Sequence, residues 1–203
     1  MKLLIAATLL AASLGAALTP AAAVTTIAAN RAGTVDSRVQ FYWGQTFTTA
    51  STIGGAGWET ITFNFYDRFN APIAVGTGYL FAAPYSGTPG GLASAGAIAS
   101  AAGNGVIYRF FTPGLRLAAA TRYYFYADGA MRLRGGAIAP GGEGFVFSQQ
   151  PTNIFSALQP QSADFTVTGT RATVPEPASW ALMIAGFGMV GTSLRRRKAV
   201  ATA

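Results

Sequence analysis

Side chains that could perform chemistry are few in this chain. Its 203 residues include no Cys and no His, which excludes Ser-His-Asp and Cys-His nucleophile systems and His-ligated zinc sites. A glycosidase needs two carboxyl groups about 5–9.5 Å apart, and no spacing selects a pair among the acids of the central region. The sequence therefore predicts no catalytic residue, no metal site and no cofactor. The acids of that region are Asp36, Glu59, Asp67, Asp128, Glu143 and Asp164.

Aromatic rings are the other chemically useful groups, because they can stack on sugar rings. In the segment that follows Thr121, strand alternation places Tyr124 and Tyr126 on one face and their neighbours on the other. One of the two faces must point outward or lie under a loop. We expect an exposed Tyr124/Tyr126 pair, flanked by Arg122, as a glycan-contacting surface. The alternative is that these rings pack in the core, as strand aromatics commonly do.

These side chains need a scaffold, and the central region is typical of β-structure. Short segments in which apolar and polar residues alternate recur roughly every 10–15 residues, separated by Gly/Pro-rich turns. The clearest runs from Trp58 to Asp67, and Asp128–Gly129 is typical of a hairpin turn. Residues 92–100 fit neither the helix period nor the strand period. The pattern predicts an all-β fold, a single antiparallel β-sandwich or jelly-roll-like domain, with a barrel as the alternative.

The N-terminus predicts export. Lys2 precedes an uncharged apolar run that closes on Pro20 and small residues, with Ala21 and Ala23 forming an A-x-A cleavage pattern. We interpret residues 1–23 as a signal peptide, handled by the Sec translocon and cut by signal peptidase after Ala23. An uncleaved N-terminal anchor is the alternative.

Charge argues against a nucleic-acid partner. The formal net charge is +7, but residues 24–174 hold nine Arg and six acids, a net +3, with no basic cluster beyond Arg132 and Arg134. Those two could meet an acidic polysaccharide. Much of the apparent basicity lies in the terminal segments, so we expect no nucleic-acid binding.

The C-terminal stretch has three consecutive parts. Pro175, Glu176 and Pro177 precede the uncharged residues 178–194. As a helix this segment would extend about 26 Å, slightly less than a hydrocarbon core of about 30 Å, so it predicts a marginal transmembrane helix. Basic residues stay on the cytoplasmic side and would leave the body in the periplasm. The basic tail consists of Arg195, Arg196, Arg197 and Lys198.

This tripartite order resembles the PEP-CTERM sorting signal of exopolysaccharide-producing Gram-negative bacteria. With Trp180 and Ala181 it is close to the PEP-x-x-W-A variant. The resemblance implies an exosortase, a membrane processing enzyme that recognises residues 175–177 and removes the tail. It further implies transient anchoring in the inner membrane, followed by delivery to the cell surface or outer envelope, or secretion.

The central region more loosely resembles the β-sandwich "choice-of-anchor" domains that precede surface-sorting signals. Such domains are defined by fold and by their neighbours, so the resemblance implies a fold and no activity. The stretches that carry it are Gly44–Phe47, Ile61–Phe65, Tyr79–Pro89, Leu115–Leu117 and Thr121–Tyr126.

The sequence thus divides into a signal peptide (1–23), a β-sandwich domain (24–173) and a sorting signal (174–198). The leading hypothesis is a non-enzymatic exported protein of the envelope or extracellular matrix, processed by an exosortase and associated with exopolysaccharide or biofilm. The alternative is a glycan-binding module that uses its aromatic face to bind exopolysaccharide. A carboxylate-dependent glycoside hydrolase is the remote alternative.

Overall fold

The computed structural model describes residues 22–36, 40–52, 56–105, 107–136, 145–148, 152–157, 162–172 and 183–188. Most of the expected signal peptide lies outside these residues. So does the expected sorting signal, apart from a helical segment at 183–188. No helix in the described part of the chain has the length and apolar character that a membrane crossing requires.

One antiparallel sheet joins the first and last strands of the body. Its order is β1-β14-β4-β5, and β8 also pairs with β4. The clearest alternating segment of the sequence forms β4, and its alternation buries Ile61, Phe63 and Phe65. The strands are β1 (Val24–Asn30), β4 (Trp58–Tyr66), β5 (Pro72–Ile73), β8 (Tyr108–Phe110) and β14 (Phe165–Arg171).

A second, six-stranded antiparallel sheet has the order β12-β11-β3-β9-β6-β7. Its strands are β3 (Phe41–Thr48), β6 (Thr77–Phe81), β7 (Ala99–Ala102), β9 (Arg122–Met131), β11 (Phe145–Ser148) and β12 (Ser156–Ala157). A small third sheet, β13-β10-β2, consists of β2 (Gly33–Asp36), β10 (Arg134–Gly136) and β13 (Ser162–Ala163).

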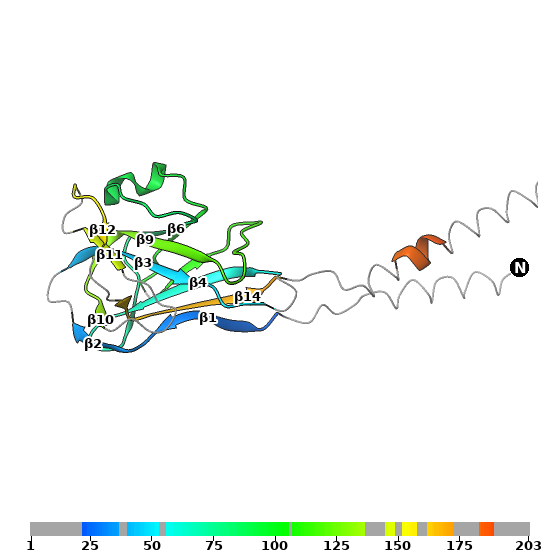
Figure 1. Cartoon of the computed structure of the whole chain (residues 1–203), viewed down its shortest axis with the longest axis horizontal. Helices are drawn as coiled ribbons and strands as arrows, with labels where there is room; N and C mark the ends of the chain where they lie inside the picture. Colours follow the sequence, from blue (N-terminus) through cyan, green and yellow to red (C-terminus); the bar gives the residue numbers. More distant parts are fainter. Residues whose placement is uncertain are drawn as a thin grey trace, which may run out of the picture.

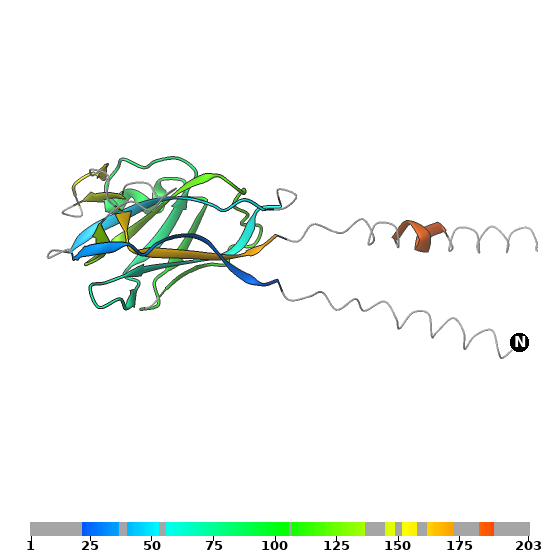
Figure 2. The same cartoon turned by 60° about the horizontal axis from the view of Figure 1, so that its bottom comes forward.

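The two larger sheets pack face to face (Figures 1 and 2). Their facing sides contribute an aromatic core. Phe63 of β4 stacks on Phe125 of β9, with ring centroids 4.5 Å apart, and on Phe165 of β14 at 5.4 Å. All three side chains are buried. Full burial of one such ring contributes about 1.5–3 kcal/mol. The all-β prediction is confirmed, and the architecture is a β-sandwich.

A second aromatic cluster lies on the other face of the six-stranded sheet. There Tyr126 of β9 packs with Phe81 of β6. The cover is formed by Tyr85, by Phe155 and by Leu92 of the 3-10 helix η3 (Pro89–Ser94). Both faces of this sheet are therefore covered around Tyr126. The ambiguous residues 92–100 form the end of η3 and the start of β7.

The predicted turn at Asp128–Gly129 is wrong, because both residues lie inside β9. The Asp128 carboxylate accepts hydrogen bonds from the Thr77 backbone N–H at 2.6 Å and from the Tyr79 hydroxyl at 3.1 Å. Gly129 passes so close to Val75 that an added Cβ would lie 2.5 Å from its backbone. The dipeptide thus serves cross-strand contact with β6 and the loop before it, and this contact outweighs its local turn preference.

Strand register places the two ends of the body together. Val24, the first residue of β1, pairs with Thr170 near the end of β14, and Arg171 pairs with Trp58 at the start of β4. We call this end of the sandwich the exit pole. The opposite end, where Asn30 and Phe65 both pair with Phe165, is the far pole. Figure 1 shows the blue β1 beginning and the orange β14 ending at the same end.

Candidate functional site

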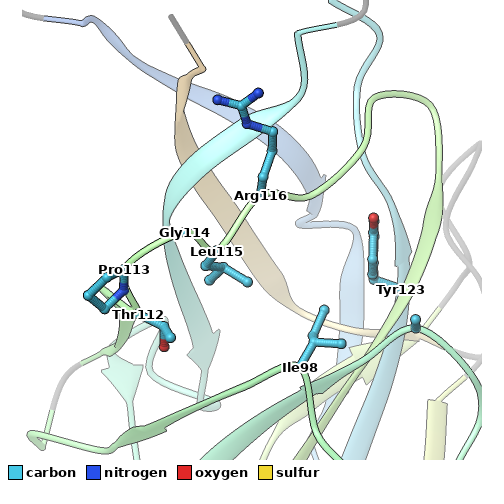
Figure 3. A pocket seen from close by; sticks show the side chains of 8 residues that line it. Ile98, Thr112, Pro113, Gly114, Leu115, Arg116 and Tyr123 are labelled. Carbon is cyan, nitrogen blue, oxygen red and sulfur yellow. The ribbon is translucent and has the colours of Figure 1, made fainter.

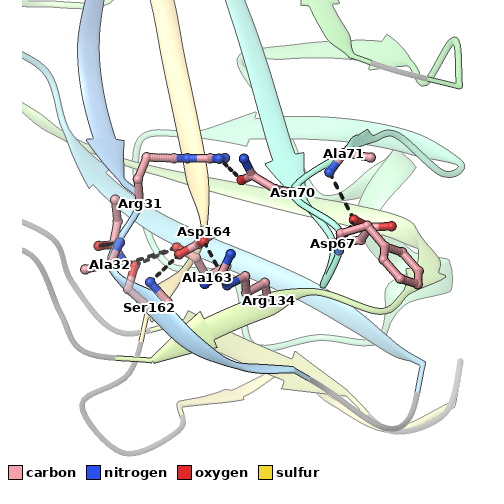
Figure 4. Close-up of polar contacts among 12 residues, drawn as sticks. Arg31, Ala32, Asp67, Asn70, Ala71, Arg134, Ser162, Ala163 and Asp164 are labelled. Atoms are coloured by element: carbon pink, nitrogen blue, oxygen red, sulfur yellow. Dashed lines mark hydrogen bonds and ion pairs between the residues drawn. The ribbon is translucent and has the colours of Figure 1, made fainter.

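Asp164, the most buried acid among the described residues, joins strands at the far pole. Its side chain is 1% exposed and accepts a hydrogen bond from the Gly33 backbone N–H at 2.7 Å. Arg134 Nε lies 3.8 Å from its other oxygen. The Asp164 backbone N–H donates to the Arg134 carbonyl at 2.7 Å. These contacts fasten β14 to β2 and β10 (Figure 4).

Asp67 shapes the turn that follows β4. Its Oδ1 accepts hydrogen bonds from the backbone N–H groups of Phe69, at 2.8 Å, and Ala71, at 3.1 Å. Arg31 donates to the Asn70 side chain of the same turn, and its guanidinium lies 3.3 Å from the centre of the Tyr66 ring. The turn, with its Arg31 contact, joins β1 to β4 at the far pole (Figure 4).

The remaining described acids are engaged elsewhere. Asp128 binds β6. Burial, together with the neighbouring Asp128 carboxylate, raises the pKa of Tyr79. Glu59 accepts a hydrogen bond from Arg116 at 2.9 Å near the exit pole, where both side chains are substantially exposed. Within the described residues, no group of three or more acids comes together as a metal site. Each of these described carboxylates thus has a separate partner. The Asp36 side chain and Glu143 lie outside the described part.

The expected exposed Tyr124/Tyr126 pair is wrong, because Tyr126 is only 1% exposed. Its hydroxyl accepts a hydrogen bond from the Tyr85 backbone N–H at 2.9 Å, and burial raises its pKa. Tyr124 is half-buried against the same cluster, and Arg122 is exposed. The reason is non-local, because residues 85–97 and Phe155 fold over this face. The only local signal was the length of the Gly/Pro-rich segment before Leu92, which gives it room to fold back.

Tyr108 is a buried polar contact that sequence reasoning missed. Its hydroxyl donates to the Val75 carbonyl at 2.7 Å and accepts from the Val75 N–H at 2.8 Å. Burial strongly raises its pKa. The tyrosine pins the loop between β5 and β6 to the core. Nothing in the sequence distinguishes it from the other strand tyrosines.

An open depression lies beside the exit pole (Figure 3). Its volume is about 350 Å³, and it is lined by residues 112–116 together with Ala82, Ile98 and Tyr123. The Tyr123 hydroxyl accepts a hydrogen bond from the Ala118 N–H at 2.9 Å, and Arg116 pairs with Glu59. A neighbouring depression of about 460 Å³ shares Thr112. No carboxylate lines either one, so neither offers an acid–base site.

The exit pole is where the body ends, close to the predicted sorting residues. Ala172 is 2% exposed, and its N–H donates to the Gly57 carbonyl at 3.1 Å. Ala23, at the expected signal-peptidase site, directly precedes β1 and is exposed. Ala21, Pro175, Glu176, Pro177, Trp180, Ala181 and the basic residues Arg195–Lys198 lie outside the described residues.

Comparison with known proteins identifies this C-terminal segment. Residues 173–198 match the family model of the PEP-CTERM protein-sorting motif. Neither the curated proteins nor the solved structures contain a significant match to the chain. The match covers the three parts found in the sequence, namely the Pro-Glu-Pro motif, the apolar segment and the basic block. The chain therefore carries a PEP-CTERM sorting motif and is an exported cell-envelope protein sorted by an exosortase.

Proposed function

We propose that this protein is a non-enzymatic building component of the outer envelope or extracellular matrix, associated with exopolysaccharide or biofilm. The observation that carries the proposal is the direct junction of a sorting motif to a closed β-sandwich, Ala172 being the last buried residue before the match that begins at residue 173. In such a chain the sorting motif directs the β-sandwich itself to the envelope or matrix.

The order of events follows from the arrangement of the segments. The Sec translocon exports the chain, and signal peptidase cuts after Ala23. Residues 178–194 then hold the body on the periplasmic side, with Arg195–Lys198 in the cytoplasm. The exosortase recognises residues 175–177, separates the body from its tail and passes it to the cell surface or the medium.

The engagement of the acids supports a non-enzymatic role. Asp164, Asp67 and Asp128 accept hydrogen bonds from backbone N–H groups, and Glu59 pairs with Arg116. A general acid of a glycosidase needs a raised pKa and a second carboxylate across a cleft. Carboxylates that hold backbone N–H groups stabilise strands and turns instead. The buried Tyr126 likewise removes the stacking pair on which the glycan-binding alternative relied.

The proposal is tested in the host organism. Cells would be separated into inner-membrane, outer-envelope and matrix fractions, with and without the exosortase gene. We expect the body in the envelope or matrix of the parent, and the full chain in the inner membrane of the exosortase mutant. Loss of the gene for this protein should weaken matrix cohesion.

The non-enzymatic part has a separate assay. Purified protein is incubated with exopolysaccharide from the same host, and new reducing ends are measured over time. We expect none above a boiled control. Formation of reducing ends that is lost on substitution of a single acid, such as Asp128→Asn, would contradict the proposal and favour the hydrolase.

A further inference from the structure

Backbone pairing in the sandwich continues to its last buried residue, Ala172. Thr170 pairs with Val24 of β1, and Arg171 pairs with Trp58 of β4. The Ala172 N–H then bonds to the Gly57 carbonyl, and the Ala172 side chain is buried. Residues 170–172 are therefore held by backbone pairing and are not available as free peptide while the body stays folded.

Chain length fixes how far the motif can lie from this closed end. Three peptide units separate Ala172 from Pro175, so the two Cα atoms are at most about 11 Å apart. A domain of this size has a radius of gyration of about 15 Å. An enzyme that holds residues 175–177 therefore cannot avoid contact with the exit pole.

Cationic and apolar side chains are exposed at the exit pole. Arg171 and Arg116 are exposed, and Val24 is 70% exposed. The one acid described beside them, Glu59, is paired with Arg116. A partner surface in contact with the pole lies within one Debye length of Arg171, which is about 8 Å at physiological salt. Such a surface interacts with the Arg171 charge, and an acidic surface would be attracted.

We propose that the exit pole is a second recognition surface for the exosortase, which reads the motif and the folded end of the body together through an acidic surface of its own. This inference rests on the proposed processing by an exosortase. The competing mechanism is that residues 170–172 separate from β1 and β4, so that the enzyme binds extended peptide alone. The two mechanisms predict opposite effects of a longer linker.

The first test inserts a Gly/Ser linker between Ala172 and Thr173 of the full chain. About eight residues would move the pole away by an r.m.s. distance of about 16 Å. We expect the processed fraction in cells to fall several-fold, because the enzyme can then bind the motif without contacting the exit pole. An unchanged or increased processed fraction would overturn the inference.

The second test reverses a charge at each pole. Arg171→Glu changes the exit pole, and Arg132→Glu makes the same change in net charge beyond the end of β9, near the far pole. Both side chains are exposed, so both variants should keep their stability to within about 0.5 kcal/mol. We expect Arg171→Glu to lower the processed fraction and Arg132→Glu to leave it unchanged. Equal processing of the two variants would contradict a cationic docking surface.

Glu176→Ala separates failure of this inference from failure of the proposed function. Absence of processing in the wild type would remove the proposed function itself. Processing that is lost in Glu176→Ala but intact in both the linker variant and Arg171→Glu would mean that the motif suffices. In that case only the docking surface would be refuted.

Discussion

The folded body and the C-terminal sorting segment encode their roles in different ways. The body depends on contacts between distant residues, such as the pairing of Val24 with Thr170 and the stacking of Phe63 on Phe125. The sorting segment is recognised from the contiguous residues 173–198. Substitutions in the body should therefore change stability, while substitutions in the motif should change processing and leave the fold intact.

The largest loss of stability is expected for Phe125→Ala. This ring lies 4.5 Å from Phe63 and 5.0 Å from Phe65 and Tyr108, between centroids. Its removal leaves a cavity between the sheets and should lower the free energy of unfolding by about 3–5 kcal/mol. Denaturant unfolding of the purified chain measures the loss. Phe69→Ala is the matched control, because Phe69 is 73% exposed, and a similar loss there would contradict the assigned core.

Asp164→Ala should have the next largest effect. It leaves the buried Gly33 N–H without its acceptor, at a cost of about 1–3 kcal/mol. Glu59→Ala removes an exposed ion pair instead and should cost less than about 1 kcal/mol. Thermal unfolding of the two variants compares them. If Glu59→Ala lowered the melting temperature more than Asp164→Ala, the contacts of Asp164 at the far pole would not have the stabilising role assigned to them.

Tyr126→Phe tests the covered face of β9. The change removes the hydroxyl that accepts the Tyr85 N–H and should cost about 1 kcal/mol, with little change in ring packing. Tyr124→Phe, at a half-buried position, is the matched control. An unchanged free energy of unfolding in Tyr126→Phe, together with a wild-type Tyr126 hydroxyl that titrates like a free tyrosine, would show that this face is open to solvent.

Alkaline pH should weaken the body through its buried tyrosines. Burial raises the pKa values of Tyr79, Tyr108 and Tyr126 above that of an unfolded chain, about 10. Stability from these groups is therefore fully present below about pH 10 and is lost as the pH rises further, because the unfolded chain ionises first. Tyr108→Phe should flatten this dependence, as measured by unfolding between neutral pH and pH 11. An unchanged slope would contradict the burial of Tyr108.

Local patterns predicted what local forces determine. The alternation of Ile61, Phe63 and Phe65 identified β4, because one buried face is sufficient to orient a strand. The Asp128–Gly129 dipeptide misled, because its turn preference is weaker than the contacts that Asp128 makes with β6. The cover over Tyr126 comes from Tyr85 and Phe155, which no period in the sequence links to β9.

The same distinction explains the functional site. Pro175, Glu176 and Pro177 are recognised as a linear peptide, so sequence alone was sufficient to find them. The exit pole was not predictable, since it exists only where β1, β4 and β14 end together. In the described part of the body, carboxylates such as Asp164 and tyrosines such as Tyr108 hold strands and loops together instead.

Intact mass spectrometry of the protein isolated from exosortase-containing cells tests whether the chain is processed at both ends. We expect a chain that begins at Val24 and ends before the apolar segment 178–194. The Glu176→Ala variant should begin at the same residue but retain its C-terminal tail. A wild-type chain that still extends to Ala203 in cells with an active exosortase would contradict this expectation.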